Sequence, residues 1–362
     1  MSDTWRLLDL GARPASYNMA IDKVIIESRS EELVPNTFRF LQFKPHCALV
    51  GYHQSIDLEI EEEYCRHNGI DINRRITGGG AIYLDESQLG WEIFALKNSP
   101  GIPKKMEDLY SLMCESAIVS LKKLGINAKF RPQNDIEVEG RKISGTGGTE
   151  FGNAFLYHGS LLIDFDVDTM LACLKLPVEK LSDKDVISFK KRVISVREIL
   201  GYVPPIEKIK DALIYGFQET LEISLEADSL IREEEARLEK YLPMFESDNW
   251  IYSKRHLEEN VDLSTVDYKA SGGLIRVSLR LDINREVIKT VFITGDFFAY
   301  PSRIILDLEA HLKNSSPLAD DLRKNMFGFF EQHHATIPGV TPEDFVQAVL
   351  AAIAQAERQT DI

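Results

Sequence analysis

Two stretches of the sequence combine basic side chains with glycines in a way that could bind an anion. The first is RRITGGGAIYLD, in which Arg74 and Arg75 precede three consecutive glycines at 78–80. Successive backbone N–H groups in a glycine turn can surround a phosphate or carboxylate, and arginine adds charge-assisted hydrogen bonds. The stretch has neither the Gly-Lys-Ser/Thr ending of a P-loop nor GxGxxG spacing. It predicts an anion site, and a glycine-rich hairpin with two surface arginines is the alternative.

The second stretch, NDIEVEGRKISGTGG, predicts a β-hairpin that turns at Glu139-Gly140 and pairs Glu137 with Lys142. Because side chains alternate along a strand, a regular hairpin puts Lys142 on the same face as Asp135 and diagonally opposite to it. At roughly 7–8 Å between backbones, a long side chain or a bridging metal could connect the two. A surface hairpin with ordinary charges is the alternative. A lone histidine, His158 in FLYHGSLL, is more typical of a buried residue than of a catalyst.

These residues need a scaffold, and the surrounding pattern predicts one of class α+β. Strands are predicted at TFRFLQF, CALVGY, DINRRI, AIYLD, LGWEIFALK and FLYHGSLLIDF, and helices at SYNMAIDKVIIESRS and KKMEDLYSLMCESAIVSLKKLG. Strands follow one another with few helical crossovers, which favours a mixed, mostly antiparallel sheet flanked by helices over a parallel Rossmann sheet. The strand-and-helix pattern restarts after NWIYSKRH. We therefore expect a catalytic domain at 1–254 and a smaller C-terminal α/β domain at 255–362.

Composition narrows the class of protein. The 362 residues carry a formal net charge of −15, which argues against nucleic acid as the main partner because phosphate-backbone binders usually carry a basic face. The sequence contains no run of 18 apolar residues, so no membrane span is expected. The start MSDTWRLLDLG does not resemble a secretory signal. Cys47, Cys65, Cys114 and Cys173 form no CxxC pair and are typical of reduced thiols. A cytoplasmic location is expected.

The ordered segments NMAID, ALVGYHQ, RRITGGGAIYLD, NDIEVEGRKISGT and YHGSLL resemble the biotin/lipoate protein ligase superfamily, and most of all its lipoate–protein ligase A branch. The later segment VFITGDFF is similar to that branch's accessory domain. The resemblance implies a synthetase-like mixed sheet and a reaction in two steps. Lipoate or octanoate and ATP, with Mg²⁺, give acyl-AMP and pyrophosphate. The acyl group then passes to a lysine of a lipoyl domain or a glycine-cleavage-type carrier.

The resemblance also implies a role for particular residues of this sequence. Lys142 would be catalytic, between the acyl carbonyl and the α-phosphate, and Asp135 would hold Mg²⁺. The nucleotide would contact Arg75, Gly80, Ala81, Ile82, Tyr83, Asn134, Asp135 and Lys142. The lipoyl group would contact Arg74, Gly78, Gly79, Lys142, His158 and Gly159. One departure is Leu84, which stands where the family block usually has a histidine.

A sister branch of the superfamily transfers octanoyl groups from a carrier protein through a cysteine thioester, and it is the main alternative. One placement of that cysteine in relatives falls near Asn127, where this sequence has none. The other falls near Cys173, offset by about one helical turn. A biotin ligase is less favoured, since its Gly-Arg-Gly-Arg core is absent, and an acyl-binding scaffold would leave Lys142 and Asp135 without a task. The sequence therefore favours the ATP-dependent ligase.

Overall fold

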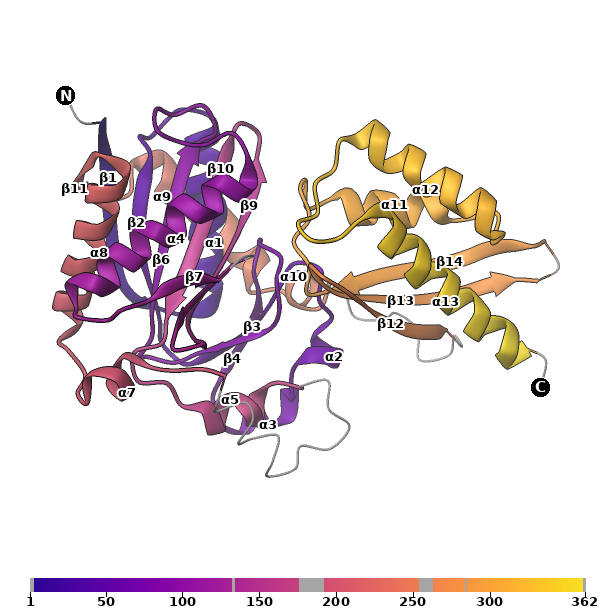
Figure 1. Cartoon of the computed structure of the whole chain (residues 1–362), viewed down its shortest axis with the longest axis horizontal. Coiled ribbons are helices and arrows are strands. Elements are labelled where there is room, and N and C mark those ends of the chain that lie inside the picture. Colours follow the sequence, from indigo (N-terminus) through magenta and orange to yellow (C-terminus); the bar gives the residue numbers. More distant parts are fainter. Residues whose placement is uncertain (1–2, 132–133, 176–191, 254–262, 284, 361–362) are drawn as a thin grey trace.

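The computed structural model describes residues 3–131, 134–175, 192–253, 263–283 and 285–360, and it consists of two units side by side (Figure 1). The larger unit contains the described residues up to 253, and the smaller one contains those from 263 onward. Each unit has its own hydrophobic core. The predicted boundary at 254/255 falls in the segment 254–262, outside the described residues, so its position stays a prediction.

An eight-stranded sheet forms the centre of the larger unit, in the order β11-β1-β2-β6-β10-β9-β8-β7. β1 is parallel to β11 and to β2, and every other neighbouring pair in this sheet is antiparallel. The predicted mixed, mostly antiparallel sheet is therefore confirmed. Its strands are β1 (Asp3–Arg13), β2 (Thr37–Phe43), β6 (Leu89–Leu96), β7 (Lys129–Arg131), β8 (Asp135–Val138), β9 (Arg141–Phe151), β10 (Ala154–Leu161) and β11 (Ile223–Ala227).

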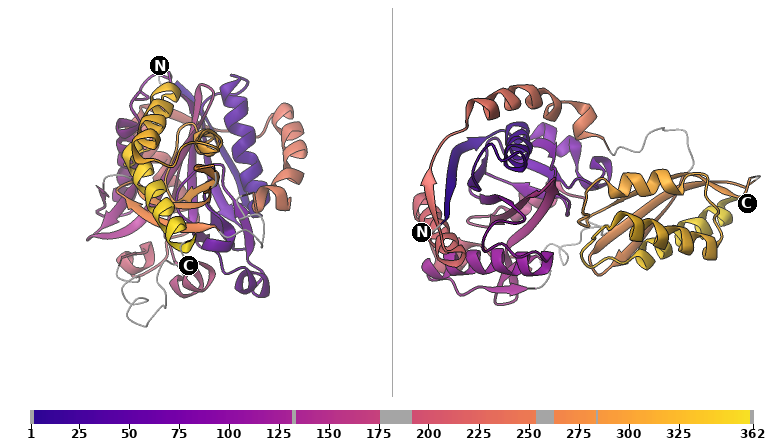
Figure 2. Two further views of the ribbon diagram at one scale, coloured as in Figure 1. Left: turned by 90° about the vertical axis from the view of Figure 1, so that its right-hand side faces the viewer. Right: turned by 90° about the horizontal axis from the view of Figure 1, so that it is seen from above.

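Helices cover both faces of this sheet, as the view from above shows (Figure 2). α1 (Ala15–Ser30) and α9 (Arg232–Phe245) lie on one side, and α4 (Met106–Lys123) and α8 (Ile206–Leu221) lie on the other. The central strand β6 is buried along its whole length. Alternation sends Trp91 into the core under α4 and α8, and Phe94 into the core under α1. The apolar run LGWEIFALK is therefore a strand covered on both faces.

A second, three-stranded sheet, ordered β4-β3-β5, holds the glycine stretch. β3 (Cys47–Val50) is central, parallel to β4 (Asp71–Arg74) and antiparallel to β5 (Ile82–Leu84). The loop from Arg75 to Ala81 connects β4 to β5, which fixes both ends of the Gly78–Gly80 run. The described part of the larger unit also contains the short helices α2 (Ile56–Glu59), α3 (Glu62–His67), α5 (Val167–Cys173), α7 (Val196–Leu200) and α10 (Asp248–Ile251).

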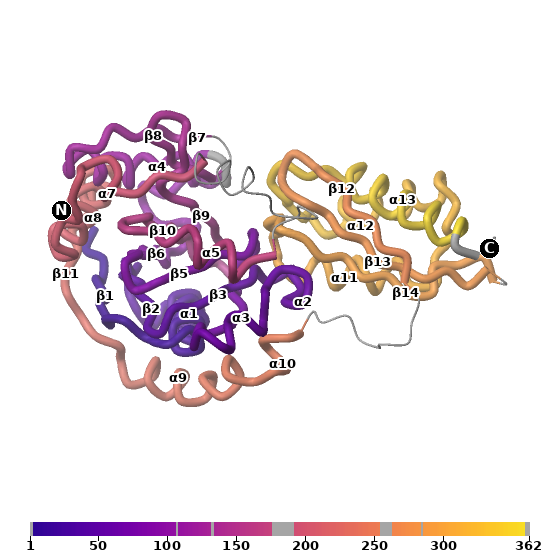
Figure 3. Tube along the Cα trace, turned by 90° about the horizontal axis from the view of Figure 1, so that it is seen from below, coloured from indigo at the N-terminus to yellow at the C-terminus, as the bar shows by residue number. Residues whose placement is uncertain are grey.

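The smaller unit is an antiparallel sheet of β12 (Ser264–Ala270), β13 (Gly273–Asp282) and β14 (Val287–Gly295), packed against helices. The helices are α11 (Ile304–Leu312), α12 (Ala319–His333) and α13 (Pro342–Thr360). Figure 3 shows α2 on the side of the larger unit that faces this smaller one, and Arg276 on β13 lies 3.4 Å from the Glu59 carboxylate on α2. Within the described segments, none of the helices has the length and apolar character needed to cross a membrane.

Candidate active site

A cavity of about 920 Å³ lies where the large sheet, the glycine loop and the smaller unit meet. This is within the range of about 300–1,000 Å³ typical of small-ligand sites. It is lined by every residue to which the sequence assigned a role except Arg74, so the predicted set converges on one site. The smaller unit contributes lining residues that sequence reasoning did not single out: Lys269, Ser271, Gly272, Gly273, Asp296, Phe298, Pro338 and Gly339.

The predicted hairpin is present as β8 and β9. Glu139 and Gly140 both have positive φ, 53° and 77°, which is the geometry of the tight two-residue turns that connect twisted strands. Glu137 faces Lys142 across the ladder, as the sequence indicated. The hairpin therefore presents Lys142 two residues after its turn.

The register beyond that pair differs from the prediction. A regular hairpin would pair Asp135 with Ser144, but an irregularity in the ladder shifts the pairing and Asp135 lies opposite Gly145. The predicted proximity still holds, because Lys142 Nζ lies 2.7 Å from Asp135 Oδ1. A Cβ added to Gly145 would lie 2.8 Å from Lys142 Nζ, so bare backbone at Gly145 makes room for the lysine side chain. The lysine side chain remains 40% exposed at the cavity.

Arg75 organises the glycine loop from inside. Its guanidinium donates hydrogen bonds to the carbonyl oxygens of Leu49 at 3.2 Å, and of Gly78 and Gly80 at 3.0 Å each. Gly79 has a φ of +94°, a conformation that favours glycine. Burial lowers the pKa of Arg75 to about 10, so the side chain remains a cation at neutral pH. Arg75 both shapes the loop and contributes positive charge to the cavity wall.

Arg74, which the resemblance assigned to the lipoyl site, is the one predicted site residue that does not line the cavity. Its side chain is fully buried and donates to the carbonyl oxygens of Gln54 at 2.6 Å and Ile251 at 3.0 Å, among others. A guanidinium engaged with backbone carbonyls on several segments is a structural cross-link. Because Arg74 and Arg75 are adjacent in the sequence, the sequence alone could not show that only one of them faces the cavity.

One part of the cavity is apolar. Its walls there include Met19, Leu41, Phe43, Leu49, Ile82 and Leu84. Leu84, which replaces the family histidine, is buried and packs in the same cluster as Leu41, Phe43 and Leu49. This lining suits an aliphatic chain.

His158 and Gly159 line the cavity from β10. His158 Nε2 lies 2.9 Å from Thr77 Oγ1, and burial, with Arg75 nearby, lowers the pKa of His158 to about 3. The imidazole is therefore neutral and is not a general acid at physiological pH. A Cβ at Gly159 would lie 2.3 Å from the Trp91 ring, so glycine there permits close packing of neighbouring strands.

A buried polar cluster that sequence reasoning missed also lines the cavity. Asp22 Oδ1 and Glu92 Oε2 accept hydrogen bonds from the same Arg39 nitrogen at 2.6 and 2.7 Å. Burial raises the pKa of Asp22 to about 6 and raises that of Glu92 well above its ordinary value. A single glutamate within the apolar strand LGWEIFALK is the sequence signal for this cluster.

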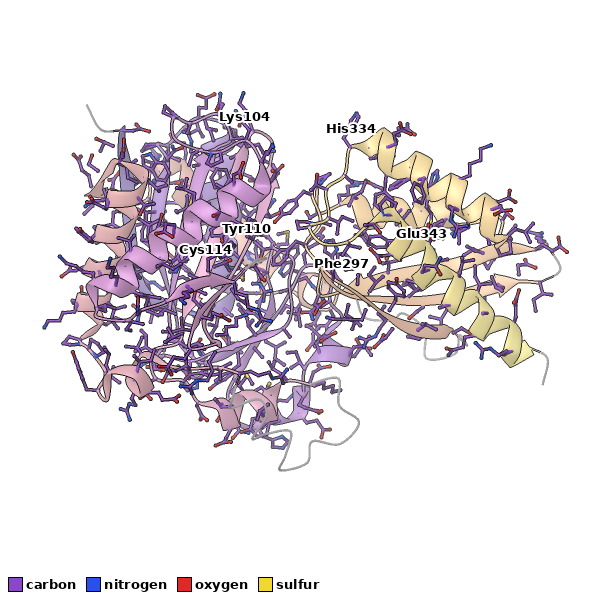
Figure 4. All side chains as sticks on the ribbon, in the orientation of Figure 1. Lys104, Tyr110, Cys114, Phe297, His334 and Glu343 are labelled. Atoms are coloured by element: carbon purple, nitrogen blue, oxygen red, sulfur yellow. The ribbon has the colours of Figure 1, made fainter. Side chains whose placement is uncertain are left out.

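The chain's four cysteines all lie among the described residues, are all buried, and none lines the cavity. Cys173 packs in a core cluster with Cys65, and its hydrogen bond to Cys65 and its burial raise the pKa of the thiol. Cys114, on α4, lies inside the larger unit (Figure 4), and its sulfur is 3.4 Å from the buried Tyr157 Oη. Burial raises its pKa as well. Neither thiol has the exposed, thiolate-favouring surroundings of a reactive cysteine.

This fold and this site define a class. The family described as the lipoyl protein ligase A/B catalytic domain matches residues 14–218, more than half of the chain. The protein therefore belongs to that family, and the predicted membership of the lipoate ligase superfamily is confirmed.

Its similar curated relatives are named octanoyltransferases. The chain is 29% identical over 276 residues to octanoyltransferase LipM of Geobacillus kaustophilus (strain HTA426), a match that covers 70% of this chain and 99% of the relative. It is 30% identical over 273 residues to octanoyltransferase LipM of Kyrpidia tusciae, a match that covers 69% of this chain and 99% of that relative. These names favour the octanoyltransferase alternative over the predicted ATP-dependent ligase.

Solved structures with a similar fold include proteins named lipoate–protein ligases. A bi-partite lipoate protein ligase from Thermoplasma acidophilum matches with a TM-score of 0.62 and 28% identity, over 72% of this chain and 99% of that one. Lipoate-protein ligase A bound with ATP matches with a TM-score of 0.60 and 26% identity, over 70% of this chain and 99% of that one. Plasmodium falciparum LipL1 in complex with lipoate, at 18% identity, shows the fold alone. That match covers 97% of this chain and 99% of the LipL1 chain, with a TM-score of 0.72.

Proposed function

We propose that this protein transfers an octanoyl or lipoyl group to a lysine of a lipoyl-accepting protein, with Lys142 at the acyl carbonyl. The ion pair of Lys142 with Asp135 at 2.7 Å, in a cavity whose lining also includes an apolar part, supports this assignment. A fixed ammonium stabilises the negative charge that develops on a carbonyl or phosphoryl oxygen during acyl transfer. Leu84 and its neighbours would hold the aliphatic chain, and Gly78, Gly79, His158 and Gly159 would flank it.

For the acyl donor, we infer an adenylate formed from ATP and the free acid. The observation that carries this inference is the absence of any cysteine from the cavity lining, since all four are described and buried. A thioester route needs a reactive thiolate within reach of the acyl group. The likeness to lipoate-protein ligase A bound with ATP is consistent with an adenylate. Arg75, Asn134, Lys142 and the segment Gly80–Tyr83 would contact the nucleotide.

Asp135, as a single carboxylate, would hold Mg²⁺ together with the phosphates of a bound nucleotide. No group of three or more potential protein ligands was found among the described residues, and Asp135 is the predicted one. Mg²⁺ is commonly bound by one or two carboxylates together with substrate phosphates and water, which a single aspartate can serve. When bound, the ion would neutralise charge on the phosphates.

Octanoyl transfer from a carrier protein, without ATP, is the second candidate. It is favoured by the names of the curated relatives, of which the chain covers 99% at up to 30% identity. In this chain the thiols nearest to such a role would be Cys173 and Cys114, both buried.

A donor assay separates the two candidates. The purified protein is given an E2 lipoyl domain as acceptor and either octanoate or lipoate with ATP and Mg²⁺, or octanoyl-carrier protein without ATP. Acylated acceptor is detected by mass spectrometry and pyrophosphate by a coupled assay. The adenylate route predicts acid-dependent pyrophosphate release and full activity of Cys114→Ser and Cys173→Ser. Acylation from the carrier alone, abolished by either substitution, would overturn it in favour of the transferase.

A further inference from the structure

The segment 295–300, which starts at the last residue of β14 and which we call the strap, attaches the smaller unit to the glycine-rich walls of the cavity. The backbone N–H of Gly79 donates to Phe297 O at 3.3 Å, and that of Gly295 donates to His53 O at 3.1 Å. At the other end of the strap, the Tyr300 hydroxyl donates to Gly148 O at 3.2 Å. Figure 4 shows Phe297 at the junction of the two units. The strap is thus held at several points along its length.

Between these attachments, the half-buried ring of Phe298 lies on bare backbone from two separate elements and lines the cavity. A Cβ added to Gly79 would lie 2.9 Å from its Cζ, and one added to Gly147 would lie 2.8 Å from its Cε1. Both distances are shorter than real side-chain contacts. Glycine at these two positions therefore allows the ring to sit directly against the main chain of the loop and of β9.

This position is next to the proposed reaction centre. Gly145 and Gly147 are two residues apart on β9, on one face and about 7 Å apart. Gly145 lies beneath Lys142, and Gly147 lies beneath Phe298. On the loop side, the ring covers Gly79, and a Cβ added to Gly79 would also lie 3.4 Å from Arg75 Nη2. The ring therefore adjoins the positions of both cationic side chains.

We propose that Phe298 excludes water from the activated acyl group, an inference that rests on the proposed function. In the side reaction, a water oxygen bonds to the acyl carbon and the bond from that carbon to the phosphate oxygen breaks. AMP leaves, and the free acid gives up its proton to solvent. In the carrier route the bond that breaks joins the acyl carbon to sulfur, and the thiol leaves. An aromatic ring over Gly79 and Gly147 carries no group that would hold such a water, and it covers backbone that would otherwise be wetted.

The measurement is the partition between hydrolysis and transfer. With acceptor present, hydrolysis is measured as the AMP released in excess of acylated acceptor or, with a carrier as donor, as the free octanoate formed. Transfer is measured as the acylated acceptor. Phe298→Ala is expected to raise the ratio of hydrolysis to transfer about tenfold, because water gains access to the intermediate. Phe298→Leu, which keeps an apolar side chain, should restore most of the protection. Phe327→Ala, at an exposed phenylalanine on α12 of the same unit, should leave the ratio unchanged.

Several outcomes would overturn the inference. A ratio in Phe298→Ala that matches wild type, or a parallel fall of hydrolysis and transfer, would reduce Phe298 to a packing contact between the units. If Phe298→Ala does not fold, Gly147→Ala provides the test, since its Cβ would displace the ring and should raise the same ratio. An unchanged ratio there would also overturn the inference. A wild-type protein that transfers no acyl group from either donor would instead overturn the proposed function, and this inference with it.

Discussion

At the scale of single residues, the site depends on small departures from regular geometry. Lys142 reaches Asp135 because the β8–β9 ladder shifts after Glu137 and because Gly145 has no side chain beneath the ammonium. The hairpin pattern was enough to predict that the lysine and the aspartate lie close together. The shift in pairing could not be predicted, because the sequence of a hairpin does not state where its ladder becomes irregular.

Lys142→Ala is expected to reduce the rate of acyl transfer by about 10²–10³ or more, because a preorganised charge at the developing oxyanion is lost. The side chain is 40% exposed, so the free energy of unfolding should change by less than about 1 kcal/mol. Transfer rates and thermal unfolding of the same preparation test both statements. Arg141→Ala is the control, since that neighbour pairs with Glu198 at the surface and should keep near wild-type activity. Full activity of Lys142→Ala would contradict the site assignment.

At the scale of elements, the Arg39 cluster connects α1, β2 and β6 at the cavity, which Asp22 and Glu92 line. Arg39 on β2 binds Asp22 of α1 and Glu92 of β6, and it also donates to Asn18 at 2.5 Å. A buried cation between two carboxylates fixes how these elements sit relative to one another. Such a cluster is costly to break, because removing one partner leaves uncompensated charge in the interior.

Arg39→Met should lower the free energy of unfolding by about 3–5 kcal/mol at pH 8. The loss should be smaller at pH 5, because the carboxyl groups of Asp22 and Glu92 can then take up protons and lose their charge. Arg237→Met is the matched control, since its partner Glu31 is half exposed and the pair should contribute no more than about 1 kcal/mol. Denaturant unfolding at both pH values measures the difference. Equal losses for the two variants would show that the buried cluster does not stabilise the fold.

The sheets and the hairpin turn were predictable because periodicity and turn residues are local. The mostly antiparallel order follows from strands that succeed one another along the chain, and the structure confirms it. The separate tasks of Arg74 and Arg75 were not predictable, since two adjacent arginines look alike until β4 turns one inward to distant carbonyls. The contribution of Phe298 depends on a contact between segments more than 150 residues apart, which no local pattern encodes.

At the scale of the whole molecule, contacts between the two units include a titratable one. Glu59 on α2 lies 3.4 Å from Arg276 on β13. Burial raises the pKa of Glu59 to about 7, with smaller increases from Asp296 and Asp267, and Arg276 only partly offsets them. The folded protein therefore holds this proton at pH values where the unfolded chain, with the ordinary value of 4.5, has released it.

Stability should consequently fall as pH rises from about 4.5 to 7, with Glu59 contributing up to about 3 kcal/mol of that change. Glu59→Gln removes the titration and should flatten this part of the stability curve. Glu63→Gln, at an exposed glutamate on the neighbouring helix α3, should leave the curve as it is. Unfolding measured across this pH range for the three proteins provides the test. A wild-type curve that Glu59→Gln does not alter would contradict the assignment.

The strap has a practical consequence for protein engineering. Phe298 rests on Gly79 and Gly147, and neither position accommodates a Cβ beneath the ring. A C-terminal unit grafted from another enzyme would therefore have to bring a strap that fits these two glycines, or the recipient walls would have to change with it. We therefore expect that the smaller unit cannot be exchanged alone. Libraries of chimeras should vary residues 295–300 together with the glycine loop and β9.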